Sequence, residues 1–272
     1  MVLREQLKAL FGRVIDIHTH IFDPLPDPSQ EQLAKMVRLA HYYGIGRLVM
    51  LGNATGMLTA HDPPTQMVSD INRYTLKAMA RYPETFVGFC YLNPANPVSF
   101  TEEEVDRCIV EGGMRGIKLW VAVKATDRRL DPIMARAQER GVPILHHTWY
   151  KATEMGPQES TPADVADLAR RWPEVTIILA HLGGGRERGV LDIVDAANLL
   201  YDTSGSQSEA GLVEYAVRRL GPERVVYGSD WPIRDFGTQI GRVLAADLSD
   251  EEKELILCST AARVLGLVGT PE

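Results

Sequence analysis

The chain has 272 residues, of which 45% are hydrophobic and 24% are charged, and its formal net charge is −7. The apolar content excludes an intrinsically disordered chain, and the acidic balance without a Lys/Arg block argues against a nucleic-acid partner. No run of about 18 uncharged apolar residues occurs, so we expect no membrane partner. The first ten residues include Arg4, Glu5 and Lys8 and lack an apolar stretch, so no signal peptide is expected. Three widely spaced cysteines without a CxxC pair indicate a cytoplasmic protein with free thiols.

Eight short runs rich in apolar and β-branched residues recur along the chain, and most of them lack strict alternation. Such runs are typical of strands buried on both faces, as in a parallel sheet. The runs cover residues 13–18, 47–51, 86–92, 116–120, 142–147, 175–181, 198–203 and 224–229.

Amphipathic helical stretches lie between these runs. They cover residues 30–43, 65–82, 101–111, 131–140, 162–172, 187–196, 209–220 and 237–245. Thr161 before Pro162 is typical of a helix start, and Gly141 is typical of a helix end.

A strand followed by a helix thus repeats eight times, at about 34 residues per unit. This order predicts a single domain over residues 1–272, an α/β TIM barrel of the (β/α)8 type. Residues 249–267 would add one or two C-terminal helices. The alternative is an open doubly wound sheet, which usually has a glycine-rich phosphate turn after its first strand. Here the first strand ends in His18-Thr19-His20, which favours the barrel.

Polar side chains gather at the expected carboxyl ends of the strands, where barrels of this type place their active sites. Five of the seven histidines are among them, and only His41 and His61 lie elsewhere and are interpreted as unrelated to a site. The strand-end residues are His18, His20, Asn53, Asn93, Lys118, Trp120, His146, His147, His181, Asp202, Ser204 and Asp230.

The pair His18-x-His20 places two imidazoles on one face of a strand, because side chains alternate with period two. Together with a histidine of the fifth strand and Asp230 they would supply three nitrogens and one oxygen to a divalent ion such as zinc. The residues alone leave open whether His146 or His147 is that third histidine. Asp16 would either orient a ligand or bond to the backbone of the barrel.

Several motifs in this order resemble the amidohydrolase superfamily. They are most similar to its amidohydrolase-related branch, which includes decarboxylases similar to aminocarboxymuconate-semialdehyde decarboxylase. The resemblance covers residues 14–267. The motifs are Ile15-Asp16-Ile17-His18-Thr19-His20, Gly116-Ile117-Lys118-Leu119, Pro143-Ile144-Leu145-His146-His147-Thr148, Ala180-His181-Leu182-Gly183-Gly184 and Gly228-Ser229-Asp230-Trp231-Pro232.

The resemblance implies roles for individual residues. The metal ligands would be His18, His20, His147 and Asp230, and Asp230 would also accept a proton. His181 would polarise the substrate or bind a second metal. Lys118 would bind an anionic substrate beside one zinc ion or, if carbamylated, bridge two ions together with His181. We expect one zinc ion, with two as the alternative.

These roles predict a hydrolase that acts on a small ester, lactone or amide through a metal-activated water. The alternative is a metal-dependent, nonoxidative decarboxylase of an unsaturated or aromatic carboxylic acid. A barrel that binds a ligand without catalysis fits less well, since every candidate group is present. The partner would be a small, anionic substrate, bound by Lys118, Trp120, Trp149 and Arg234, and a homodimer is expected.

Two further features carry weaker expectations. Trp231 follows a strand end and would either line the pocket beside Trp120 and Trp149 or pack in the core. The run Gly183-Gly184-Gly185-Arg186 would bind an anion through its backbone N–H groups, or form a tight turn that gives the His181 region room. The tight turn is the favoured interpretation.

Overall fold

The computed structural model describes residues 8–55, 61–151, 154–205 and 209–267. The N-terminal residues 1–7, where we expected no signal peptide, lie outside this part. All strand pairs are parallel, in two sheets of order β1-β2-β3 and β4-β5-β6-β7-β8-β9. The strands are β1 (Val14–Ile21), β2 (Ile45–Asn53), β3 (Phe86–Gly88), β4 (Cys90–Tyr91), β5 (Ile117–Leu119), β6 (Ile144–His146), β7 (Ile177–Leu179), β8 (Leu199–Asp202) and β9 (Val225–Val226).

Backbone hydrogen bonds join the two sheets into a barrel. The third expected strand is present as β3 and β4, which Phe89 separates. At the other junction, the Ile17 amide donates to the Tyr227 carbonyl (3.0 Å) and the Asp230 amide donates to the His18 carbonyl (2.8 Å). The expected (β/α)8 barrel is therefore confirmed, and the open sheet is excluded.

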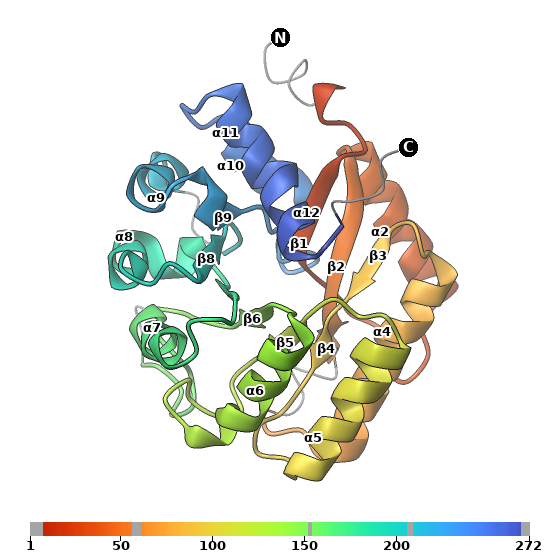
Figure 1. Cartoon of the computed structure of the whole chain (residues 1–272). Helices are drawn as coiled ribbons and strands as arrows, with labels where there is room; N and C mark the ends of the chain where they lie inside the picture. Colours follow the sequence, from red (N-terminus) through yellow and green to blue (C-terminus); the bar gives the residue numbers. More distant parts are fainter. Residues whose placement is uncertain (1–7, 56–60, 152–153, 206–208, 268–272) are drawn as a thin grey trace.

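Helices surround the strands on the outside (Figure 1). They are α2 (Gln30–Tyr42), α4 (Thr65–Arg81), α5 (Val98–Val105), α6 (Asp131–Arg140), α7 (Pro162–Arg171), α8 (Leu182–Ile193), α9 (Leu212–Leu220) and α10 (Phe236–Leu244). Thr161 closes a capping box with Asp164 at the start of α7, and Gly141 ends α6 in the left-handed region.

Two segments differ from the sequence expectation. A π-helical turn, Asp106–Glu111, continues α5. Helix α8 contains a kink at Arg186 (φ 52°), so a short helical turn over the glycine run precedes the helix expected from residue 187.

The buried side chains form an outer and an inner core. The outer core lies between strands and helices, while the inner core fills the barrel with residues such as Ile17, Val49 and Ile178. The C-terminal segment comprises α11 (Asp250–Glu254), a π-helical turn (Leu255–Ser259) and α12 (Thr260–Val264). Ala261 of α12 and Leu265 belong to the inner core, so this segment covers one end of the barrel.

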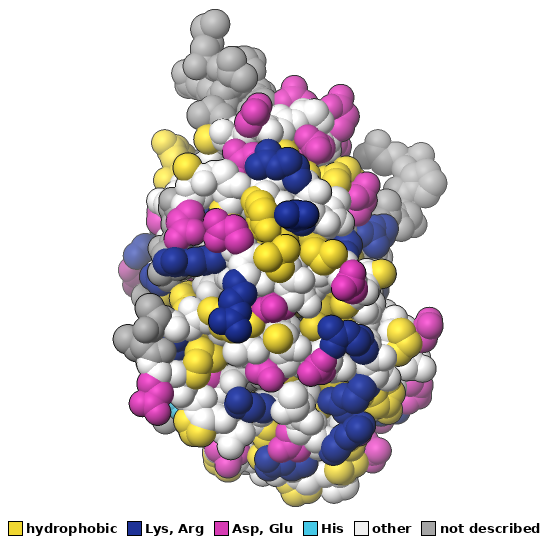
Figure 2. Space-filling model, turned by 90° about the vertical axis from the view of Figure 1, so that its left-hand side faces the viewer, with side chains coloured by type: hydrophobic (Ala, Val, Ile, Leu, Met, Phe, Trp, Pro, Cys, Tyr) yellow, Lys and Arg dark blue, Asp and Glu magenta, His cyan; other side chains and the backbone are white. Residues whose placement is uncertain are grey.

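The face of the molecule formed by the later helices carries Lys/Arg and Asp/Glu side chains interspersed, and Figure 2 shows no separate basic patch on it. No helix in the described residues is long and apolar enough to cross a membrane.

Candidate active site

The first strand carries a bulge that turns both histidines of the His18-x-His20 motif into one cavity. Asp16 pairs with Leu48 and Thr19 with Met50, so β1 has one more residue than β2 between these positions. Consequently Ile17 packs in the inner core while His18, directly after it, also lines the cavity.

Asp16 stabilises this bulge rather than facing the cavity. Its Oδ1 accepts hydrogen bonds from the backbone amides of His18 (3.1 Å) and Ser229 (2.9 Å). Burial raises the pKa of Asp16 to about 7, against the hydrogen bonds from Ser229. Of the two expectations for Asp16, the structure shows the carboxyl group bonded to barrel backbone.

Three acceptor atoms converge at the carboxyl end of β1. The Nε2 atoms of His18 and His20 lie 3.2 Å apart, and Asp230 Oδ1 lies 3.5 Å from the first and 3.8 Å from the second. All three side chains are buried, and their ligand atoms form a group that could hold a metal ion.

The hydrogen bonds made by Nδ1 of His18 and of His20 show that the Nε2 atom of each ring is an acceptor. His18 Nδ1 lies 2.6 Å from Asp202 Oδ2, and His20 Nδ1 lies 3.4 Å from the Gly52 carbonyl. A carboxylate and a carbonyl have no hydrogen to donate, so each Nδ1 carries the proton. Burial lowers the pKa of both imidazoles well below the usual range, which leaves each Nε2 with a lone pair.

Two lone pairs and the carboxyl group of Asp230 therefore face one another, and burial raises the pKa of that carboxyl group to about 7. Such an arrangement is repulsive by itself and is favourable around a cation. Tetrahedral ligands about 2.1 Å from a zinc ion lie about 3.4 Å apart, which agrees with the observed separations of 3.2, 3.5 and 3.8 Å. The residues present therefore fit a divalent metal ion.

Of the two histidines that end the fifth barrel strand, His147 lines the cavity. Its Nδ1 lies 3.2 Å from His181 Nε2, so these rings are neighbours in the site. The ring of His146 is buried, and its Nδ1 donates to the His147 carbonyl at 2.8 Å. Burial lowers the pKa of His146 to about 4. His147 does not belong to the three-residue acceptor group, and its role as the fourth ligand stays a prediction.

Lys118 of β5 reaches the same cavity from within the barrel. Its side chain is buried, and among the described residues no carboxylate lies within ion-pair distance of its amine. Burial lowers the pKa of this amine to about 8, although Asp202 and Asp230 oppose the shift. An ammonium with no carboxylate partner in a cavity is suited to an anionic ligand.

The cavity has a volume of about 560 Å³. Trp120, Trp149 and Arg234 line it, as the sequence predicts. Trp231 does not: its ring stacks on Phe236 at 5.3 Å and is buried. Of the two expectations for Trp231, core packing is therefore confirmed.

The glycine run after β7 makes room for aromatic rings. A Cβ on Gly184 would lie 2.7 Å from the Trp149 ring, and one on Gly185 would lie 1.8 Å from the Tyr201 hydroxyl. The residue before the helix, His181, has φ 71°, in the left-handed region. These close approaches support the favoured interpretation, a turn that makes space.

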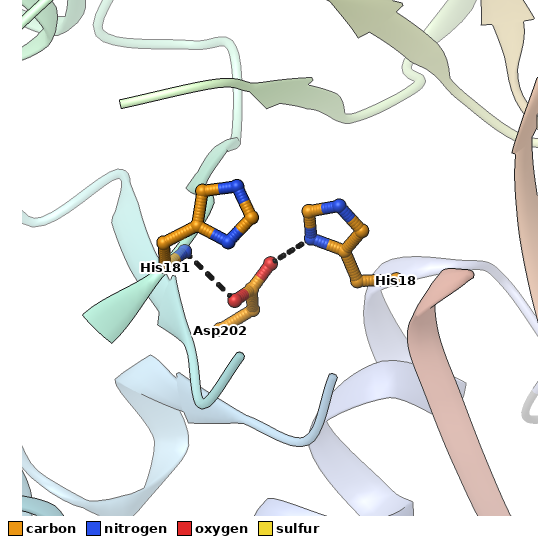
Figure 3. Close-up of side chains that lie close together, drawn as sticks. All are labelled: His18, His181 and Asp202. Carbon is orange, nitrogen blue, oxygen red and sulfur yellow. Dashed lines mark hydrogen bonds and ion pairs between the residues drawn. The ribbon is translucent and has the colours of Figure 1, made fainter. Parts of the chain in front are cut away.

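Sequence reasoning gave no role to two residues that the structure places at the site. Asp202 contacts both His18 and His181 (Figure 3). Its place at a strand end beside the histidines is the sequence signal that marks Asp202 as their partner.

The second missed residue is His61, which lines the cavity with its ring 5.4 Å from that of Trp120. Asn93 fixes the segment after His61 by donating to Asp62 Oδ1 (2.7 Å) and to the Pro63 carbonyl (2.9 Å). The structure therefore places His61 at the cavity, where the sequence predicts no role for it. No sequence signal marked it, because it lies on a loop rather than at a strand end.

Comparison with solved structures supports the fold. A 2,6-dihydroxybenzoate decarboxylase from Rhizobium is 17% identical, with a TM-score of 0.75 over 94% of this chain and 99% of that chain. A 5-carboxyvanillate decarboxylase from Sphingomonas paucimobilis is 14% identical, with a TM-score of 0.74 over 93% and 99%. A dihydroxybenzoic acid decarboxylase from Polaromonas with bound manganese is 19% identical, with a TM-score of 0.69 over 89% and 87%.

No curated protein matches the chain at a significant level. The family model described as amidohydrolase, in contrast, matches residues 15–267, which is nearly the whole described part. Together with the barrel and the acceptor group at its strand ends, this match shows that the chain belongs to the amidohydrolase family and is a metal-dependent enzyme of it.

Proposed function

We propose that the protein is a metal-dependent, nonoxidative decarboxylase of an aromatic carboxylic acid. The observation that carries the proposal is one cavity that combines tryptophan walls, the ammonium of Lys118 and the three-residue acceptor group. Aromatic walls suit a planar, apolar ligand body, and the ammonium suits its carboxylate. The similarity to three decarboxylases of aromatic acids supports the same substrate class.

The proposed cofactor is one divalent ion, with zinc as the first choice, held by His18, His20, His147 and Asp230. When bound, it would act as a Lewis acid that draws electron density from the oxygens of the substrate. Manganese is the competing ion, since the Polaromonas decarboxylase carries it. A second ion bridged by Lys118 and His181 is disfavoured, because both ring nitrogens of His181 already have partners in Ser204 and His147.

In the proposed reaction, Lys118 and Arg234 orient the substrate carboxylate and Trp120 and Trp149 hold the ring. Asp230 delivers a proton to the ring carbon that bears the carboxylate. The bond between that carbon and the carboxylate then breaks, its electron pair restores the aromatic ring, and carbon dioxide leaves. The net change replaces the carboxylate by hydrogen and consumes one proton, which Asp230 regains from solvent. His181 is proposed to assist Asp230 in the protonation of the substrate carbon.

Hydrolysis of a small ester, lactone or amide is the second candidate, and family membership favours it. The same acceptor group and Asp230 would serve that reaction. The two candidates differ in their product, since only decarboxylation releases carbon dioxide.

A substrate panel separates them. The enzyme loaded with zinc or with manganese is incubated with 2,6-dihydroxybenzoate, 5-carboxyvanillate and related hydroxybenzoates, and in parallel with simple esters, lactones and amides. We expect carbon dioxide from at least one aromatic acid, a loss of at least 100-fold in Asp230→Asn, and a raised KM in Lys118→Met. Release of acid from the esters, lactones or amides, without carbon dioxide from any aromatic acid, would refute the decarboxylase and support the hydrolase.

The single domain and the homodimer also remain proposals. Size-exclusion chromatography with light scattering tests the dimer, for which twice the chain mass is expected.

A further inference from the structure

Asp202 lies at the centre of the histidine cluster, although it does not line the cavity. It is completely buried and accepts hydrogen bonds with both carboxylate oxygens. Oδ2 accepts from His18 Nδ1 at 2.6 Å. Oδ1 accepts from the backbone amides of His181 and Ser204, both at 2.9 Å, and from the Ser204 hydroxyl. Figure 3 shows the carboxylate between the two rings.

The Ser204 hydroxyl extends this network to the ring of His181 and, through that ring, to His147. Its oxygen also lies 3.4 Å from His18 Nδ1, a longer contact than the 2.6 Å from that nitrogen to Asp202. Its single hydrogen points to Asp202, which has none to offer, so its oxygen accepts from His181 Nδ1 at 2.8 Å. His181 Nε2 is then unprotonated and accepts from His147 Nδ1 at 3.2 Å. As a result, His147 Nε2 also carries a lone pair. The chain Asp202–Ser204–His181–His147 thus determines the tautomer of a ring that Asp202 does not touch.

Asp202 could instead be a metal ligand, since it forms a second candidate group with His18 and His181. The distance argues against this. The contact of 2.6 Å between His18 Nδ1 and Asp202 Oδ2 has the length of a charge-assisted hydrogen bond. Two tetrahedral ligands of one zinc ion would lie about 3.4 Å apart. The carboxylate therefore bonds to the ring instead of sharing an ion with it.

We propose that Asp202 is a positioning residue for the metal. It acts on His18 directly and on His147 through Ser204 and His181, and it holds the proton of each ring on Nδ1. One buried carboxylate thereby keeps the Nε2 lone pairs of two ligands from different strands available to the ion. The inference rests on the proposed metal site.

Two variants separate the branches of this network. In Asp202→Asn, the amide can donate to His18 Nδ1, which moves the ring proton to Nε2 and removes that ligand. In Ser204→Ala, His181 Nδ1 loses its acceptor, so His181 and His147 can both reverse their tautomers while His18 keeps its bond to Asp202. Asp23→Asn is the matched control. It makes the same change at a buried carboxylate that bonds to Tyr74 and Ser29 and to none of the described histidines.

The test uses two readouts that need no organic substrate. Nitrogen-15 NMR of the metal-free protein reports which nitrogen of each ring is protonated, and competition with a coloured chelator gives the affinity for Zn²⁺ or Mn²⁺ alone. We expect the Nδ1–H form for His18, His147 and His181 in the natural chain. Asp202→Asn should weaken zinc binding by about 10- to 100-fold, Ser204→Ala should reverse only His147 and His181, and Asp23→Asn should bind zinc like the natural chain.

Three results would overturn the inference. One is an Nε2–H form of His18 or His147 in the natural chain. Another is zinc affinity of Asp202→Asn within twofold of the natural value, and the third is failure of the natural chain to bind either ion. If Asp202→Asn does not fold, the NMR of the natural chain and of Ser204→Ala still tests the network. Unchanged tautomers of His147 and His181 in Ser204→Ala would contradict the branch through Ser204. Because no turnover is measured, a negative carbon dioxide assay would refute the decarboxylase and leave this test intact.

Discussion

At the scale of single residues, the adjacent side chains of His146, which ends β6, and His147, which follows it, have opposite environments. His147 lines the cavity, whereas His146 is buried with its Nδ1 bonded to backbone. Hydrophobic patterning could not distinguish them, because a strand buried on both faces shows no alternation. The resemblance to the amidohydrolase superfamily did distinguish them, because it implied His147 and not His146 as a metal ligand.

This difference predicts opposite effects of the same substitution. His147→Ala should weaken zinc binding by at least 100-fold, because it removes a ligand nitrogen, with little loss of stability. His146→Ala should bind zinc within threefold of the natural chain but unfold more easily by roughly 2 kcal/mol, because it leaves a cavity. Chelator competition and urea unfolding measure the two quantities. Equal zinc affinities of the two variants would refute the assignment of His147.

Lys118 gives a prediction about pH. Burial lowers the pKa of its amine from 10.5 to about 8, so between these values the unfolded chain keeps a proton that the folded protein has lost. The free energy of unfolding therefore rises with pH between about 8 and 10.5. Below pH 8, burial of the charged Lys118 amine destabilises the fold by its full amount.

Lys118→Met should consequently be stabilised relative to the natural chain below pH 8. This advantage should shrink by roughly 3 kcal/mol as the pH rises to about 10.5. Urea unfolding of both metal-free proteins at several pH values measures the difference, in which other alkaline titrations cancel. Parallel stability curves for the two proteins would contradict the assigned environment of Lys118.

At the scale of elements, the start of α8 shapes the cavity wall. Trp149 packs directly on Gly184, where an added Cβ would lie 2.7 Å from the ring. In contrast, a Cβ on Gly241 of α10 would meet no atom within 4 Å.

Gly184→Ala should therefore displace Trp149, lower the free energy of unfolding by about 1–3 kcal/mol, and raise the KM of the aromatic substrate. Gly241→Ala is the matched control, and it should leave KM unchanged and stabilise the fold by about 0.5–1 kcal/mol. Thermal unfolding and steady-state kinetics check both variants. An unchanged KM in Gly184→Ala would mean that Trp149 does not contact the substrate.

At the scale of the whole molecule, the acceptor group links metal binding to stability. His18, His20 and Asp230 come from the first and last barrel strands, so an ion between them connects both ends of the sheet. Without a cation, their facing lone pairs and carboxylate oppose closure of the barrel.

Zinc at 100 times its dissociation constant should stabilise the fold by about 2.7 kcal/mol. For a chain of this length this corresponds to a rise in Tm of roughly 5 °C. Differential scanning calorimetry with zinc, manganese or excess chelator measures the shift, and magnesium serves as the comparison ion, since it favours oxygen ligands. A shift that is as large with magnesium would contradict the nitrogen-rich site.

The sequence predicts the barrel because each strand–helix unit has its own local pattern, from the apolar run of β2 to the cap at Thr161. It also predicts that the histidines converge, because parallel strands end at the same edge. It does not predict the bulge in β1, since both Ile15 and Ile17 are apolar and the extra residue is defined only by pairing with β2. Nor does it predict His61, whose position depends on the bonds that Asn93 makes across the chain.

Two residues of the site, His181 and Asp230, have left-handed backbones, with φ of 71° and 61°. Side chains other than glycine adopt this region at a cost of about 1 kcal/mol or more, and a fold retains it where the surrounding structure enforces it. Asp230→Gly should for this reason be more stable than Asp230→Ala, although both lack the carboxylate. Selection for thermal stability alone would thus favour glycine at these two positions. A variant selected in this way would lose the side chains of His181 or Asp230, and with them its catalytic activity.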